Sequence, residues 1–382
     1  MPANSVFPIP NSEFEAAPFF MARALELAAR GQGYVEPNPM VGCVLVRDGE
    51  VVGEGWHGKF GGAHAEVEAL HVAGPRAKGA TAYVTLEPCC HQGKTPPCTQ
   101  SLINAGIAKV VCAQRDPFEA VSGQGIAALH EAGIDVEVGL MAAEAHRLNA
   151  PYLKLIATGR PWIIAKWAMT LDGKIATAAG NSHWISSEAS RQIVQQLRSR
   201  VDGILIGSGT AKMDDPLLIA RHPGPRVATR IIAESQAALS PNSQLVQTAR
   251  DAPVLIAAAP AAPQENIDRL TAAGCEVITC RAADAAEKLV SIPALLNELG
   301  RRRMTNVLVE GGGKLLGALF DAGAIDEVHV FIAPKLIGGA SAPSPIAGTG
   351  VEKIAAALHL ADIELRHTGE DLYLRGRIHR DS

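Results

Sequence analysis

Short apolar runs alternate with segments of helical periodicity along most of this chain, and that alternation restricts the folds available to it. Near the beginning, apolar runs at 41–46 and 51–56 flank Asp48-Gly49, a dipeptide typical of a tight hairpin turn. The next expected strands and helices are strands at 81–86, 109–113 and 134–138, with helices at 19–30, 64–73, 99–105 and up to 132. Such alternation indicates a layered α/β sheet.

The second part of the chain repeats this organisation with a sheet of its own. A strand at 162–167 is followed by a helix at 187–200 and an apolar strand at 203–206. Further buried strands are expected at 230–233, 254–258, 277–279, 306–309 and 327–332. The second part is therefore also predicted to be α/β.

Three residues that disfavour regular structure, Pro151, Gly159 and Pro161, separate the two patterns. At 382 residues the chain is also long enough for two domains. We therefore expect one domain at 1–150 and a second at 151–382.

Charge and cysteine content narrow the class of function. The 35 basic and 39 acidic residues give a formal net charge of −4, which provides no general attraction to nucleic acid or an anionic membrane. The sequence also lacks a membrane-spanning apolar run and a signal-peptide pattern at its start. The seven cysteines are an odd number, thinly spread, as in a protein of the reducing cytoplasm. A small-molecule partner is favoured.

A loop with three cysteines and several prolines is a candidate metal site. Cys89, Cys90 and Cys98 lie in this loop, Cys98 begins a predicted helix, and His64 begins the preceding one. Two helix N-termini could thus converge on one zinc ion, with one imidazole and two thiolates as ligands and water in the fourth position. Glu66, two residues after His64, would then transfer protons. The predicted reaction is the hydrolytic deamination of a ring carbon.

Alternatives to this ligand set stay open at this point. The zinc deaminase signature pairs His-x-Glu with Pro-Cys-x-x-Cys, whereas eight residues separate Cys89 from Cys98. Cys90 is a competitor, although neighbouring residues seldom direct two sulfurs at one tetrahedral centre, and His91 is a weaker one. His-x-Glu alone is more often a solvated helix start. Its combination with Pro-Cys and a second cysteine favours a catalytic site over a structural zinc site, which four protein ligands would close.

Glycine-rich turns in the second part suggest phosphate binding. The turns at 207–210 and 311–313 each follow a predicted strand and could place backbone N–H groups against a phosphate. For 207–210 an ordinary turn is the better interpretation, whereas for 311–313, which precedes an apolar helix, a turn that serves only packing is about equally good. Lys166 and Glu310 are candidates for supporting imine formation or protonation. The cluster 301–303 could recruit a phosphate or nucleic acid, but a charged helix end is the better interpretation.

Motifs spread over nearly the whole chain resemble those of the bifunctional riboflavin-biosynthesis deaminase/reductase family. The residues that carry the resemblance are 38–43 (NPMVGC), 64–66 (HAE), 86–98 (LEPCC through GKTPPC), 168–174 (AMTLDGK), 184–185 (WI), 214–216 (DDP), 310–312 (EGG) and 333–335 (APK). The resemblance implies a cytidine-deaminase-like three-layer domain followed by a dihydrofolate-reductase-like α/β domain. It also implies zinc-dependent deamination of 2,5-diamino-6-(5-phosphoribosylamino)pyrimidin-4-one, then NADPH reduction of 5-amino-6-(5-phosphoribosylamino)uracil to the ribitylamino product.

The same resemblance assigns residues to both sites. The zinc ligands are His64, Cys89 and Cys98, and the proton shuttle is Glu66. The NADPH contacts are Ala168, Trp184, Thr210, Asp214, Ser235, Gly312, Gly313, Lys314, Leu315, Leu316, Gly317 and Ala318. The substrate contacts are Ser182, Arg198, Leu218, Arg221 and Glu310, of which the arginines suit a ribose phosphate because a guanidinium can form two parallel hydrogen bonds with it. We also expect a homo-oligomer.

Two rival functions are compatible with part of this pattern. One is a nucleobase or tRNA deaminase with an unrelated appended domain, against which the negative net charge and the second α/β domain both argue. The other is a zinc-stabilised interaction protein without turnover. Metal stoichiometry together with activity would separate these from the bifunctional enzyme.

Overall fold

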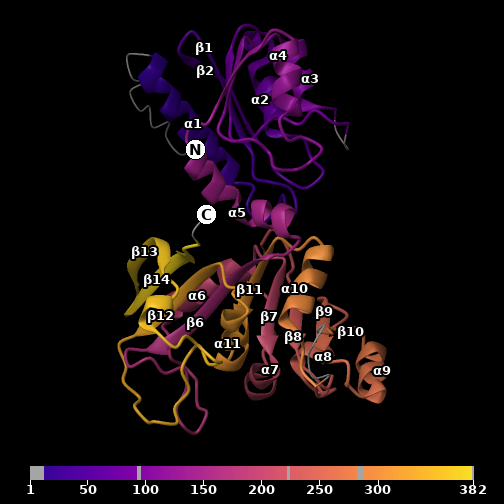
Figure 1. Cartoon of the computed structure of the whole chain (residues 1–382), viewed down its shortest axis with the longest axis vertical. Coiled ribbons are helices and arrows are strands. Elements are labelled where there is room, and N and C mark those ends of the chain that lie inside the picture. The colour runs from indigo at the N-terminus through magenta and orange to yellow at the C-terminus, as the bar shows by residue number, and fades with distance from the viewer. Residues whose placement is uncertain (1–12, 93–95, 222–223, 282–287, 381–382) are drawn as a thin grey trace. The chain divides into compact units, whose positions relative to one another are not determined.

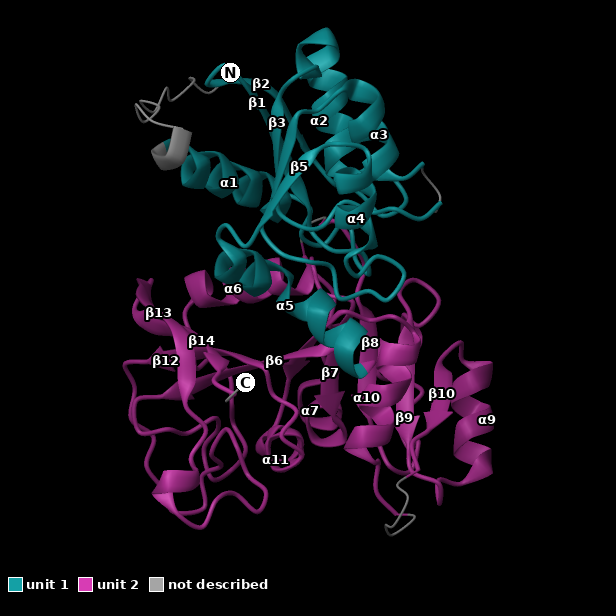
Figure 2. Ribbon diagram, turned by 45° about the horizontal axis from the view of Figure 1, so that its top comes forward, with its two compact units in different colours: residues 1–158 teal, residues 159–382 magenta. Residues whose placement is uncertain are grey.

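The computed structural model describes residues 13–92, 96–221, 224–281 and 288–380. The chain divides into two compact units, residues 1–158 and 159–382 (Figure 2). Residues 93–95 of the cysteine-loop motif lie outside the described residues. No helix within the described part is long and apolar enough to cross a bilayer.

Unit 1, coloured indigo to magenta in Figure 1, contains a five-stranded sheet, and the strand order is β2-β1-β3-β4-β5. Strand β1 pairs antiparallel with β2 and β3, whereas β3, β4 and β5 are parallel. The strands are β1 (Gly42–Arg47), β2 (Glu50–Trp56), β3 (Thr81–Val84), β4 (Lys109–Cys112) and β5 (Asp135–Val138). The helices are α1 (Glu13–Ala29), α2 (Ala65–Ala73), the 3-10 turn η1 (Gly74–Ala77), α3 (Cys98–Ala105), α4 (Gln124–Glu131) and α5 (Ala142–Thr158).

Successive residues of a strand point to opposite faces of the sheet, and in this unit both faces are apolar. Helices cover both faces. Leu45 packs with residues of α2, α3 and α4, whereas its neighbour Val44 packs with residues of α1 and α5. The predicted three-layer α/β arrangement is therefore confirmed. Gly55 allows α2 to approach the sheet, since a Cβ there would lie 2.3 Å from the carbonyl oxygen of Ala65. That approach fixes the N-terminal end of α2, which carries His64 and Glu66.

Helix α5 differs from the sequence-based expectation, because it continues through Pro151. Contacts on both sides of the proline tie the helix to unit 1. The side chain of Asn149 exchanges hydrogen bonds of 2.8 and 2.9 Å with the backbone of Met40, and the Tyr152 hydroxyl donates to Asp116 at 2.9 Å. The boundary expected at 150/151 thus falls inside a helix, and the units divide at its end.

Unit 2 contains a nine-stranded sheet in the order β10-β9-β8-β7-β11-β6-β12-β14-β13. The strands from β10 to β12 are parallel, and β14 and β13 follow as an antiparallel pair at one edge. The strands are β6 (Trp162–Thr170), β7 (Gly203–Gly207), β8 (Thr229–Ala233), β9 (Val254–Ala258), β10 (Glu276–Thr279), β11 (Asn306–Glu310), β12 (Glu327–Ala333), β13 (Leu360–Thr368) and β14 (Asp371–Ile378). The sequence-based prediction lacked the last two.

Helices cover the sheet of unit 2 over two large apolar cores, one on each face. They are α6 (Glu188–Arg198), α7 (Ser208–Asp214), α8 (Gln244–Gln247), α9 (Gln264–Ala272), α10 (Ile292–Arg301), α11 (Gly313–Asp321) and the 3-10 turn η2 (Ile354–Ala356). Because the central strands are parallel, their carboxyl ends meet at one edge of the sheet, where α/β proteins commonly bind ligands.

Candidate functional site

His64, Cys89 and Cys98 form a compact group in unit 1. The Nδ1 atom of His64 lies 3.1 Å from Cys98 Sγ and 3.5 Å from Cys89 Sγ. All three potential ligand atoms lie within 4.8 Å of one another. One imidazole nitrogen and two sulfurs are a donor set that suits zinc and leaves a fourth tetrahedral position open. The residues present therefore fit a catalytic zinc ion.

Helix starts bring these side chains together. His64 is the N-cap of α2, and Cys98 is the first residue of α3 after Pro97. The amide of Cys98 donates to the sulfur of Cys89 at 3.4 Å. The Cys98 thiol and this helix start lower the pKa of Cys89 to about 4, whereas the hydrogen bond with Cys89 raises the pKa of Cys98.

Glu66 lies in the first turn of α2 and is almost completely buried, with 3% of its surface exposed. Burial raises the pKa of its carboxyl group, and a hydrogen bond with Cys98 opposes that effect. For His64, the hydrogen bond with Cys89 raises the imidazole pKa, and burial lowers it. The buried Glu66 carboxylate thus lies beside the ligand group, of which Cys98 is buried and His64 and Cys89 are partly exposed.

The competing ligands Cys90 and His91 point elsewhere. The thiol of Cys90 contacts the carbonyl oxygen of Ala120 at 3.7 Å, and the ring of His91 lies edge-on to Phe118. Neither belongs to the compact group, so the geometry favours Cys98 over Cys90.

Sequence reasoning missed His57 as a part of this site. Its ring lies edge-on to that of His64, with the ring centroids 5.3 Å apart. His57 Nδ1 lies 2.9 Å from the carbonyl oxygen of Ala63, so this nitrogen carries the proton, and Nε2 can accept from the Asn38 amide at 3.3 Å. Burial lowers the pKa of His57. The available signal was its position directly after a predicted strand.

In unit 2, Arg198 and Glu310 form a bidentate ion pair. Arg198 Nε and Nη2 donate to the two carboxylate oxygens of Glu310 at 2.6 and 2.8 Å. Lys166 stands next to Glu310 in the register of β6 and β11, and burial lowers its pKa. The sequence analysis suggested that the Arg198 guanidinium binds a phosphate through two parallel hydrogen bonds. In the structure, Glu310 accepts two such hydrogen bonds from Arg198 Nε and Nη2. This ion pair is largely buried.

The two glycine-rich turns of unit 2 lie against each other, because β7 and β11 are neighbours in the sheet. The amide of Gly312 donates to the hydroxyl of Thr210 at 3.1 Å. Gly312 is the N-cap of α11, and Thr210 lies in the first turn of α7. The starts of α7 and α11 thus meet at the carboxyl edge of the sheet, and helix N-termini are common phosphate-binding positions.

The remaining candidate residues of unit 2 lie around the same edge. Ala168 is near the end of β6, and Ser235 follows β8. Asp214 ends α7, and the backbone amide of Arg221 donates to the side chain of Gln195 on α6 at 2.8 Å. The others lie on α11 (Gly313, Lys314, Leu315, Leu316, Gly317 and Ala318) or in loops (Ser182, Trp184 and the buried Leu218). Within the described residues, no recorded side-chain hydrogen bond joins Ser182 or Ser235 to the other candidates.

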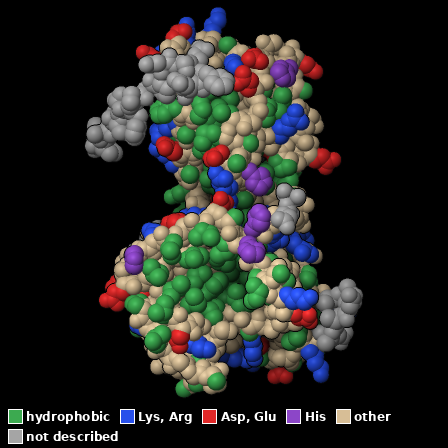
Figure 3. All heavy atoms as spheres, turned by 60° about the vertical axis from the view of Figure 1, so that its left-hand side comes forward, with side chains coloured by type: hydrophobic (Ala, Val, Ile, Leu, Met, Phe, Trp, Pro, Cys, Tyr) green, Lys and Arg blue, Asp and Glu red, His purple; other side chains and the backbone are tan. Residues whose placement is uncertain are grey.

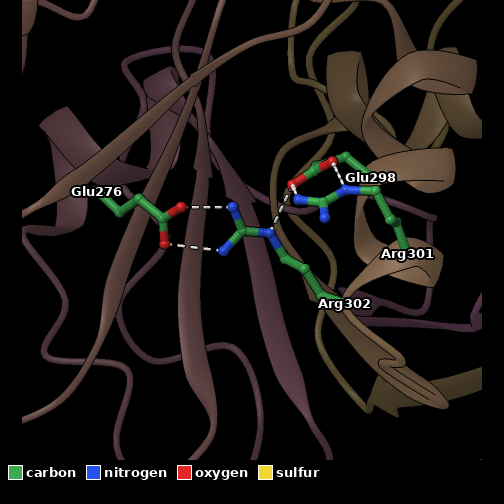
Figure 4. Close-up of polar contacts among 4 residues, drawn as sticks. All are labelled: Glu276, Glu298, Arg301 and Arg302. Atoms are coloured by element: carbon green, nitrogen blue, oxygen red, sulfur yellow. Dashed lines mark hydrogen bonds and ion pairs between the residues drawn. The ribbon is translucent and has the colours of Figure 1, made fainter.

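The arginine cluster 301–303 is largely used in ion pairs (Figure 4). Arg301 and Arg302 both donate to Glu298, one helical turn earlier. Arg302 also forms a bidentate pair with Glu276 on β10. The interpretation as a charged helix end is therefore favoured over a phosphate or nucleic-acid site.

Each unit matches a different sequence family. Residues 15–114 match the cytidine and deoxycytidylate deaminase zinc-binding region, and residues 161–374 match the RibD C-terminal domain. The riboflavin biosynthesis protein RibD of Actinobacillus pleuropneumoniae is 41% identical over 96% of this chain and 97% of its own. RibD of Escherichia coli (strain K12) is 42% identical over 93% of this chain and 98% of its own.

Solved structures give the same result for the complete chain. RibD of Acinetobacter baumannii (form 1) matches with a TM-score of 0.83 and 35% identity, covering 95% of this chain and 99% of that one. A diaminohydroxyphosphoribosylaminopyrimidine deaminase/5-amino-6-(5-phosphoribosylamino)uracil reductase of Thermotoga maritima matches with a TM-score of 0.80 and 32% identity. It covers 95% of this chain and 98% of its own. Both the fold and the order of the two units are thus shared with these proteins.

Proposed function

The chain belongs to the RibD family of bifunctional riboflavin biosynthesis enzymes, and we propose that unit 1 carries its deaminase reaction and unit 2 its reductase reaction. The protein is a deaminase and a reductase with zinc and NADPH as cofactors. A nucleobase or tRNA deaminase with an unrelated appendage is not favoured, since residues 161–374 match the RibD C-terminal domain. The convergence of His64, Cys89 and Cys98 next to the buried Glu66 is the observation that carries the assignment of unit 1.

The proposed substrate of unit 1 is 2,5-diamino-6-(5-phosphoribosylamino)pyrimidin-4-one, in agreement with the name of the Thermotoga relative. His64, Cys89 and Cys98 would hold the zinc ion. Zinc supplies a Lewis acid that makes water nucleophilic near neutral pH. Glu66 would accept the first proton of the attacking water and pass it to the ring nitrogen. It would then transfer the second proton, from the hydroxyl formed on the ring carbon, to the amino group, which leaves as ammonia.

The proposed substrate of unit 2 is 5-amino-6-(5-phosphoribosylamino)uracil. NADPH supplies the hydride that converts the ribosyl chain to ribityl. Thr210 and the start of α11 would hold the cofactor phosphates, and Ala168, Trp184, Asp214 and Ser235 would form further contacts with NADPH. Arg221 and Ser182 bind the ribose phosphate, Leu218 contacts the substrate, and Arg198 orients Glu310 beside the sugar. Lys166, adjacent to Glu310 in the sheet, delivers the proton that accompanies reduction.

A substrate experiment separates the two reactions. The diaminopyrimidinone ribotide is supplied with and without NADPH, and ammonia release and NADPH oxidation are followed separately. Ammonia release without NADPH, and NADPH oxidation only after ammonia release, are the expected results. Ammonia release that depends on NADPH would contradict the division between units.

We also propose that the protein is a cytoplasmic homo-oligomer. The exposed apolar residues of the edge strand β13 are the feature that supports an interface between copies. Ile363 and Leu365 on this strand are 59% and 62% exposed. Figure 3, which brings this side of unit 2 forward, has a broad group of hydrophobic side chains on it. Exposed apolar edge strands readily pair with a second chain. Antiparallel pairing of two copies about Leu365 places Glu364 opposite Arg366, residues that already form a 3.0 Å ion pair within one chain.

Sedimentation velocity tests this interface. Leu365→Lys is expected to convert the oligomer to a smaller species, because it places two cations opposite each other at the centre of the pairing. Val227→Lys is the matched control, since Val227 is 66% exposed elsewhere in unit 2. An unchanged sedimentation coefficient for Leu365→Lys would place the interface elsewhere.

A further inference from the structure

Three consecutive carbonyl groups in the loop after β6 accept hydrogen bonds from two cations. The ammonium of Lys335 donates to the carbonyl oxygens of Trp184 at 2.9 Å and Ile185 at 2.8 Å. The guanidinium of Arg191, on α6, donates to the carbonyl oxygen of Ser186 at 2.7 Å. The segment 184–186 lies outside any helix or strand. The two cations therefore provide the hydrogen bonds that regular structure would otherwise provide.

Lys335 is itself held by contacts between the loop after β6 and the loop after β12. The amide of Leu171 donates to the carbonyl oxygen of Lys335 at 2.9 Å. The carboxylate of Asp172 accepts from the Thr170 hydroxyl at 2.6 Å and from the Gly338 amide at 2.7 Å. These bonds, that of Thr170 first, lower the pKa of Asp172 to about 2. Residues 170–174 and 333–335, to which the proposed reactions assign no contact, thus meet here.

Arg191 is held by the anchored N-terminus of α6. The N-cap Ser187 accepts from the amide of Ser190 at 3.3 Å. Asp371 on β14 accepts from the Ser187 amide at 2.7 Å and from the Ser190 hydroxyl at 2.5 Å. From this fixed position, the guanidinium of Arg191 lies over the indole of Trp184, 4.6 Å from the ring centroid. The same arginine thus restrains both the backbone and the ring of this loop.

We infer that Lys335 and Arg191 are positioning residues that preorganise the indole of Trp184 for binding NADPH. Trp184 is 64% exposed, so its ring offers a surface to a ligand, while the two cations fix the backbone that carries it. A loop that is ordered before binding loses less conformational entropy when the ligand arrives. The inference rests on the proposed role of Trp184 as an NADPH contact.

Substitution of Lys335 in the full-length chain tests the inference. Lys335→Met removes the ammonium with little change in length, and we expect the dissociation constant for NADPH to rise about tenfold. The kcat at saturating NADPH should stay within about twofold of the unsubstituted protein, because Lys335 is remote from the proposed proton donors. Lys335→Arg should restore most of the affinity. Lys353→Met, at an exposed lysine in the loop before η2, is the matched control.

Two further variants make every outcome informative. Arg191→Met should weaken NADPH binding in the same way, so the inference remains testable where Lys335→Met fails to fold. Trp184→Ala separates the inference from the proposed function. Weaker binding in Trp184→Ala, with unchanged binding in Lys335→Met and Arg191→Met, would overturn the positioning role and leave the NADPH contact intact. Unchanged binding in Trp184→Ala would overturn both.

Discussion

The carboxylate of Glu87 accepts a 3.0 Å hydrogen bond from the amide of Gly125, which ties the residue before Pro88-Cys89 to the start of α4. Glu87 is 4% exposed. A Cβ at Gly125 would lie 2.1 Å from the carbonyl oxygen of Pro88, so the two segments are in close contact. The same carboxylate accepts from the amides of Asp116, Gly123 and Ile126. Glu87 thereby fixes the segment that carries the proposed zinc ligand Cys89.

Glu87→Gln should therefore loosen α4 and weaken zinc retention. The substitution replaces one carboxylate oxygen by an NH2 group, which cannot accept from the backbone amides, and buried groups left without partners cost roughly 1–3 kcal/mol each. Hydrogen exchange at residues 123–126 and the zinc content after dialysis measure the two effects. Glu131→Gln, at an exposed position of the same helix, is the control. Normal protection of 123–126 in Glu87→Gln would show that Glu87 does not hold this segment.

The sequence predicted the elements around the zinc site better than their mutual contacts. His64, Glu66 and Cys98 lie at helix starts that follow strands, and this order is visible in the local pattern of residues. The contacts of Glu87 are not visible in the local pattern of residues, because its partners lie 29 to 39 residues further along the chain. Nothing in the sequence near Lys335 indicates Trp184 as its partner, 151 residues earlier.

The missed elements of the fold have physical causes. Residues 362–366 of β13 alternate polar and apolar side chains, a pattern that the sequence-based prediction overlooked, but 362–367 are all exposed, so pairing with β14 and not burial holds this strand. Helix α5 was missed because Pro151 usually interrupts a helix. Here the tertiary hydrogen bonds of Asn149 and Tyr152, on either side of the proline, compensate for the lost backbone bond. Both outcomes depend on contacts with distant parts of the chain.

Glu66→Gln should retain zinc and lose ammonia release by about two to four orders of magnitude, the usual contribution of a general acid/base. The amide cannot accept the proton of the attacking water, whereas His64, Cys89 and Cys98 are unchanged. Zinc content, ammonia release and NADPH oxidation with the deaminated intermediate are measured on the same preparation. NADPH oxidation should persist, and its loss together with ammonia release would contradict independent reactions in the two units.

Cys98→Ser and Cys90→Ser form a matched pair, because both replace a thiol in the same loop. Cys98 lies 3.1 Å from His64, whereas the thiol of Cys90 is directed at Ala120. Cys98→Ser should lose zinc, and Cys90→Ser should retain it at the level of the unsubstituted protein. The zinc-to-protein ratio measures both. The opposite result would mean that Cys90 is the ligand.

The acid stability of unit 2 should depend on Glu327. Burial raises the pKa of this carboxyl group, but hydrogen bonds and charge from His329 and Arg375, at 2.9 and 2.7 Å, lower it from 4.5 to about 2. Because the pKa of Glu327 is lower in the folded state than in the unfolded state, the ionised carboxylate stabilises the fold at pH values above the unfolded-state pKa of about 4.5. This stabilisation is lost as the pH falls from about 4.5 to about 2. The shift corresponds to about 3 kcal/mol of unfolding free energy.

Glu327→Gln removes the titrating group, so the unfolding free energy of the variant should change less than that of the unsubstituted protein between these pH values. Denaturant unfolding at several pH values measures the difference, and tryptophan fluorescence follows unit 2 because it contains Trp162, Trp167 and Trp184. Glu265→Gln, at an exposed carboxyl group on α9, should leave the pH dependence unchanged. Equal pH dependence in Glu327→Gln and the unsubstituted protein would mean that the loss of stability in acid arises from other carboxyl groups.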